Sequence, residues 1–85
     1  MTVRDIVRMT NQIVDFFKSY PHDVAVKETA GHIRSFWDPR MRRQLFELLA
    51  EGGQGLSAIA LEAAKILAAE QAAKDAKPAA KAGIS

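Results

Sequence analysis

Apolar residues recur at intervals of three and four along most of this chain, and this helical period restricts the fold more than any other feature. Near the N-terminus the row consists of Ile6, Met9, Ile13, Phe16 and Tyr20. Such spacing places side chains on one face of a helix, whereas a half-buried strand alternates every second residue. No segment shows that alternation. The sequence therefore predicts an all-α fold.

Proline and capping residues set the limits of the first two predicted helices. The first begins after Thr2, a good N-cap residue, and ends before Pro21, because a residue that precedes proline is driven out of helical geometry. His22 and Asp23 are expected to cap the second helix, which ends at Phe36.

The third and fourth predicted helices have clearer start signals. Asp38 supplies an N-cap and Pro39 a proline at the first helical position, where its missing N–H does no harm. Gly52-Gly53 ends the third helix, since a positive φ at a helix C-terminus favours glycine. Ser57 caps the fourth helix. The short loops favour antiparallel neighbours, so we expect a small four-helix domain.

The C-terminal end of the chain differs in composition from the rest. Beyond Ala68 the apolar residues are mostly alanine, and Lys74–Ser85 is rich in alanine and lysine and contains proline and glycine. Such a segment buries little apolar surface. We therefore predict a helical domain over residues 2–72 and a flexible, disordered tail over residues 73–85.

The chain has 85 residues and no cysteine, which restricts both its stability and its chemistry. A domain this small has a limited core, and disulfides, metals or partners usually supplement it. Without cysteine, disulfides, thiolate metal sites, cysteine-ligated iron–sulfur clusters and cysteine nucleophiles are excluded. A partner protein is the remaining external source of stability.

The charge balance and the hydropathy of the chain argue against further classes of protein. The net charge of +2 belongs to the tail, where three lysines face one aspartate, so residues 1–73 are neutral overall. This balance gives little support for nucleic-acid binding. No apolar run is long enough to span a membrane, and the N-terminus shows no signal-peptide pattern. We expect a cytoplasmic protein that binds neither nucleic acid nor membrane.

No recognised catalytic or metal-binding pattern is present. His22 and His32 lie ten residues apart, which matches no paired-histidine motif. The glycines at 52, 53 and 55 follow a predicted helix, whereas a phosphate-binding loop normally follows a strand and carries a lysine. We therefore assign no catalytic, cofactor-binding or metal-binding residue, and we expect that the chain is not an enzyme.

The segment from His32 to Arg43 is the best candidate for a functional surface. It combines the single tryptophan with four arginines around one acidic residue. Tryptophan and arginine are enriched at binding hot spots, and arginine pairs well with carboxylates. The predicted partner interface consists of Trp37, Arg40 and Arg43, supported by Phe36 and Met41. A structural interpretation is equally open, in which the aromatic residues are buried and the arginines are solvated.

The first helix has a wider apolar arc than one neighbour would cover. Besides the row given above, it carries Val3, Val7, Val14 and Phe17. An apolar patch left exposed on a small protein usually marks an association surface, which includes self-association of the isolated chain. The alternative is a central helix contacted on several sides.

These residues together resemble a known family. The chain is similar to the delta subunit of NAD-dependent formate dehydrogenase from about Val7 to Leu67. The matching motifs are Asn11–Ile13, Phe16–Phe17, Tyr20–Asp23, His32–Arg42, in which Phe-Trp-Asp-Pro-Arg-Met-Arg is the most specific run, and Gly52–Leu56.

The resemblance implies a non-catalytic accessory subunit in a cytoplasmic complex that oxidises formate and reduces NAD. In such complexes the alpha subunit holds the molybdopterin cofactor, and other subunits hold iron–sulfur clusters and FMN. The expected role is docking on the alpha subunit to support assembly or stability, with no cofactor in this chain. The alternative hypothesis is a small basic helical module that binds nucleic acid through Arg40, Arg42 and Arg43.

Overall fold

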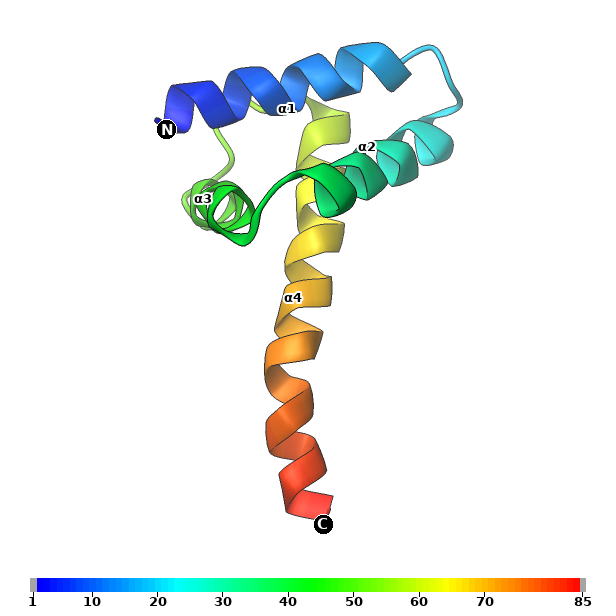
Figure 1. The fold of residues 1–85 in the computed structure, drawn as a ribbon. Coiled ribbons are helices and arrows are strands. Elements are labelled where there is room, and N and C mark those ends of the chain that lie inside the picture. The colour runs from blue at the N-terminus through cyan, green and yellow to red at the C-terminus, as the bar shows by residue number, and fades with distance from the viewer. Residues whose placement is uncertain (1, 85) are drawn as a thin grey trace.

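The computed structural model describes the backbone of residues 2–84 and the side chains of residues 2–75. Within residues 2–84 the chain forms helices and no strand, which confirms the predicted all-α class. The four helices are α1 (Val3–Phe17), α2 (His22–Phe36), α3 (Pro39–Ala50) and α4 (Ala58–Ile84) (Figure 1).

Three of the predicted N-caps are confirmed by hydrogen bonds. The Thr2 hydroxyl accepts from the Asp5 amide, and the Asp5 carboxylate accepts from the Thr2 amide, both at 3.2 Å. Asp38 accepts from the Met41 amide at 2.9 Å, and Ser57 accepts from the Ala60 amide at 3.3 Å. These bonds satisfy amide donors that have no partner within their own helix.

The α1 cap depends on the charge of Asp5. Hydrogen bonds from the backbone and side chain of Thr2 lower the pKa of the Asp5 carboxyl. A carboxyl whose pKa is lower in the folded state than in the unfolded state stabilises the fold at pH values above its unfolded pKa. This contribution is lost as the pH falls through the lowered value.

The predicted boundary between the first two helices was partly wrong. α1 ends at Phe17 instead of Tyr20, and a turn in which the Tyr20 amide donates to the Phe17 carbonyl at 3.0 Å precedes Pro21. α2 begins at His22, with Pro21 as its N-cap and no side-chain cap. His22 therefore does not cap the helix. Its ring instead pairs with Glu62 of α4, a contact between elements that local sequence cannot indicate.

The glycine stop of α3 is confirmed. Gly52 and Gly53 have φ angles of 113° and 65°, and their amides donate to the carbonyls of Leu49 at 3.1 Å and Leu48 at 2.8 Å. This is the Schellman pattern, which requires a left-handed residue after the helix. A Cβ atom on Gly53 would overlap Leu61, so the same turn also packs the loop against α4.

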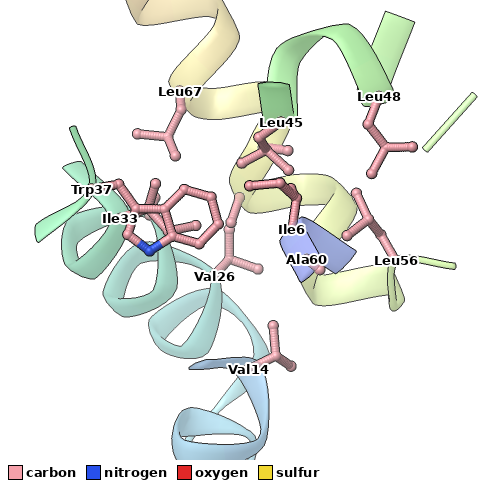
Figure 2. Close-up of a cluster of buried hydrophobic side chains, with 13 residues drawn as sticks. Ile6, Val14, Val26, Ile33, Trp37, Leu45, Leu48, Leu56, Ala60 and Leu67 are labelled. Atoms are coloured by element: carbon pink, nitrogen blue, oxygen red, sulfur yellow. The ribbon is translucent and has the colours of Figure 1, made fainter. Parts of the chain in front are cut away.

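All four helices contribute to one hydrophobic core, which lies where α2 and α4 pack together (Figure 2). Ala60, Ala63 and Ala64 of α4 are fully buried, and small side chains of this kind allow neighbouring backbones to come close. The larger members of the core are Ile6, Val14, Val26, Ile33, Trp37, Leu45, Leu48, Leu56 and Leu67.

The arrangement of the helices departs from a simple antiparallel bundle. α1 and α2 run in opposite directions, as the short loop predicted, whereas α1 lies across the N-terminal end of α4 (Figure 1). α1 contacts all three other helices, which supports the central-helix interpretation of its wide apolar arc, while Val3 and Phe16 of the same helix stay exposed, as the association-surface interpretation expects. To contact α2, α3 and the N-terminal end of α4 together, α1 has to cross α4 at an angle. Loop lengths do not specify such crossing angles.

The C-terminal half of α4 projects away from the other three helices (Figure 1). Leu67 is the last buried apolar residue of α4 among the side chains described, in agreement with the expected limit of the core. The helix itself continues to Ile84, beyond residue 72, where the helical domain was expected to end. The division into a domain of residues 2–72 and a flexible tail of residues 73–85 stays a prediction, since the tail side chains beyond Asp75 lie outside those described.

Trp37 and Phe36 are adjacent in sequence but differ in their structural role. Trp37 is 6% exposed and belongs to the core, whereas Phe36 is 75% exposed. We predict that Trp37→Ala lowers the free energy of unfolding by about 3–5 kcal/mol. Phe36→Ala should change it by less than about 0.5 kcal/mol. Urea denaturation followed by circular dichroism measures both, and equal effects would contradict the assignment of Trp37 to the core.

Two glycine substitutions should change the free energy of unfolding in opposite directions. A Cβ atom at Gly31, inside α2, would meet only the Arg34 guanidinium at 3.8 Å, so Gly31→Ala should raise the free energy of unfolding by about 1 kcal/mol. Gly52 has φ 113° and open space around it, so Gly52→Ala should lower that free energy by about 1–3 kcal/mol through backbone strain. Thermal denaturation of both variants tests the pair.

Candidate docking surface

The structure separates the five predicted interface residues into buried and exposed groups. Trp37 is in the core, and Met41 is half-buried against it. Phe36, Arg40 and Arg43 are exposed. Of the two interpretations that the sequence left open for Trp37, its burial favours the structural one. The separation arises because the backbone becomes extended at Trp37, with φ −88° and ψ 140°, between two helices.

Two arginines near the α2–α3 junction serve the fold. The guanidinium of Arg34 forms a bidentate pair with Glu70 of α4, at 3.0 and 2.7 Å. Arg42 donates to the backbone carbonyl of Arg34 at 3.1 Å and so satisfies a carbonyl at the C-terminal end of α2. These bonds tie α2 to α3 and α4.

The other two arginines of this segment are available to a partner. Arg40 and Arg43 form no ion pair with a described residue, and with Asp38 and Pro39 they line a shallow depression at the start of α3. The sequence could not distinguish the two pairs of arginines, because Glu70 lies far away in the chain. With Arg42 engaged, only two of the three arginines invoked for nucleic-acid binding remain free among the described residues.

An apolar groove lies between α1 and the C-terminal half of α2. Its volume is about 360 Å³. The side chains that line it are Met9, Gln12, Ile13, Phe16, Phe17, His32 and Trp37. Sequence reasoning singled out only Trp37 of this set as a contact residue. The wide apolar arc of the first helix was the signal for the α1 side of the groove, and His32 began the segment chosen as the candidate functional surface without being named as a contact residue.

Aromatic rings form the rims of this groove, with Phe16 on the α1 side and His32 on the α2 side, where Phe36 packs on His32 just outside the lining. Phe16 is 75% exposed and meets Phe17 edge-on, with ring centroids 4.9 Å apart. On the α2 side the rings of His32 and Phe36 are 4.8 Å apart. Covering one phenylalanine side chain contributes about 1.5–3 kcal/mol, so these rims provide a strong apolar contribution to association. Exposed aromatic residues grouped around a groove are typical of an interaction site.

Asn11 holds the loop between α3 and α4 against the opposite side of α1. Its side-chain amide donates to the Gly55 carbonyl at 2.8 Å, and its amide oxygen accepts from the Ser57 backbone amide at 3.1 Å. A Cβ atom on Gly55 would lie 3.0 Å from Val7, so the loop approaches α1 closely. The sequence alone did not reveal this role, since the partners lie more than forty residues away.

Neither histidine belongs to a metal site that the described residues form. No group of three histidine or carboxylate side chains in the described part of the chain could hold a metal ion. In the same part, no helix is both long enough and apolar enough to cross a membrane.

The comparison with protein families decides which group the chain belongs to. The family described as "NADH-dependant formate dehydrogenase delta subunit FdsD" matches residues 5–64. The chain belongs to this delta-subunit family. No curated protein and no solved structure matches the chain.

The match confirms the resemblance seen in the sequence. It begins within α1 and ends within α4, so it includes the groove, the exposed arginine pair and the Asn11 contact of this delta subunit. The part of α4 that projects from the core lies outside the match. The shared region therefore contains most of the packed helical body, and the buried Leu67 lies just beyond it.

Substitutions at two adjacent residues of α1 should differ in their effect on stability. We predict that Asn11→Ala lowers the free energy of unfolding by about 1–3 kcal/mol, because two loop hydrogen bonds are lost. Gln12 is exposed and lines the groove, so Gln12→Ala should change stability by less than about 0.5 kcal/mol. Chemical denaturation of the two variants checks this, and equal stability of the Asn11 variant and the parent would refute the loop contact.

Proposed function

We propose that this delta subunit is a non-catalytic accessory subunit of a cytoplasmic NAD-dependent formate dehydrogenase. It docks on the molybdopterin-containing alpha subunit and supports assembly or stability of the complex. The match to the delta-subunit family carries this proposal. The aromatic groove and the exposed arginine pair support it, because they provide a surface suited to binding another protein.

The proposal assigns no cofactor to this chain. Its sequence contains no cysteine and so cannot ligate an iron–sulfur cluster through thiolates. The molybdopterin cofactor, the clusters, FMN and NAD belong to other subunits in this scheme. The contribution of the delta subunit is then the stabilisation of its partner, which follows from binding only the folded form.

Affinity purification with a tag on the delta subunit tests the proposal. The alpha subunit should co-elute, and a complex prepared from cells without the delta subunit should lose formate–NAD activity, molybdopterin content or thermal stability. The purified delta subunit alone should show no formate–NAD activity. A Trp37→Ala variant, whose core is disrupted, serves as the control that retains the tag but lacks the docking surface. An eluate without the alpha subunit, or turnover by the isolated chain, would contradict the proposal.

A further inference from the structure

Trp37, which lines the apolar groove, is followed directly in the chain by the residues that line the arginine depression. Trp37 lines the groove, Asp38 caps α3, and Arg40 follows in the first turn of that helix. α1 contacts both α2 and α3, the two helices that Trp37 and Asp38 link. One end of the groove therefore lies beside two cationic side chains.

The two arginines at this end form no ion pair with a described carboxylate, although Arg43 also lines a second hollow together with Asp75, whose carboxylate accepts from Gln71. The groove lining contains no carboxylate. Asp38 lies in the depression with Arg40 and Arg43, but its carboxylate already accepts the Met41 amide. Arg40 and Arg43 form no ion pair with any described side chain, so a partner with carboxylates would be complementary to this end.

The helices that form the groove restrict which kind of partner segment can bind in it. The α1 side presents Met9, Gln12, Ile13 and Phe16, which have the spacing of one helix face. Both walls are helices whose backbone groups are paired internally, so they offer no open edge to an added strand. An amphipathic helix fits such a groove through residues on one of its faces.

Building on the proposed function, we propose that this groove binds an amphipathic helix of the formate dehydrogenase alpha subunit. The apolar face of that helix covers Phe16 and the His32–Phe36 pair. Its acidic end pairs with Arg40 and Arg43.

The contribution of the aromatic residues is tested by measuring the affinity of the delta subunit for formate dehydrogenase that was prepared without a delta subunit. Phe16→Ala combined with Phe36→Ala should weaken binding by about 30-fold or more, as expected when two central aromatic contacts are truncated. Val3→Ala combined with Val24→Ala removes exposed apolar side chains elsewhere and should change affinity less than about 3-fold. Both variants alter exposed positions, and circular dichroism verifies that they fold.

Charge reversal tests the acidic end of the partner. Arg40→Glu combined with Arg43→Glu should weaken binding by about 10-fold at low salt and flatten its dependence on ionic strength. Lys27→Glu combined with Lys65→Glu produces the same net charge on exposed positions outside the groove and should leave affinity nearly unchanged. Equal effects of the two charge reversals would overturn the arginine part of the inference.

A photo-reactive p-benzoylphenylalanine in place of Phe36 identifies the occupant directly. We expect a cross-linked alpha-subunit peptide with helical apolar spacing and acidic residues at one end. An adduct with a second copy of this chain or with another subunit would overturn the inference. If the unmodified delta subunit does not bind the complex, the proposed function fails. If it binds and the Phe16→Ala, Phe36→Ala variant binds equally well, only the groove inference fails.

Discussion

The close packing of α2 against the alanine face of α4 is the contact on which the rest of the structure depends. α2 and α4 form the most extensive helix–helix contact, and Ala60, Ala63 and Ala64 of α4 are fully buried in the same core as Val26 and Ile33 of α2. The larger residues of the core pack around these small side chains. α1, α3 and the Trp37 side chain surround this pair and complete the core.

This arrangement explains why a protein with a small core still exposes large aromatic rings. α1 contacts three helices through Ile6, Val14 and their neighbours, and its remaining apolar side faces the groove. Phe16 at the rim and Phe36 beside His32 stay exposed because no described element covers them. The same helix is thus both a central part of the core and one wall of the candidate docking site.

Local sequence was sufficient for the helix class, most helix limits and the glycine stop of α3, because capping and φ preferences act within a few residues. It was insufficient at the α1–α2 junction, where His22 pairs with Glu62 instead of capping its own helix. In the candidate site, sequence reasoning named Phe36, Arg40 and Arg43 as interface residues, and the structure places all three at the surface. Sequence reasoning could not separate these from Trp37, whose burial depends on residues of other helices.

The sequence by itself determined an all-α chain, its delta-subunit resemblance and the exclusion of cysteine chemistry, since these follow from periodicity, motif and composition. Only the tertiary structure decided which arginines are engaged and which are free. Arg34 pairs with Glu70 because α2 packs on α4, whereas Arg40 and Arg43 form no ion pair with a described acid. The groove likewise exists only after two helices pack side by side, because its walls come from segments that are separate in the chain.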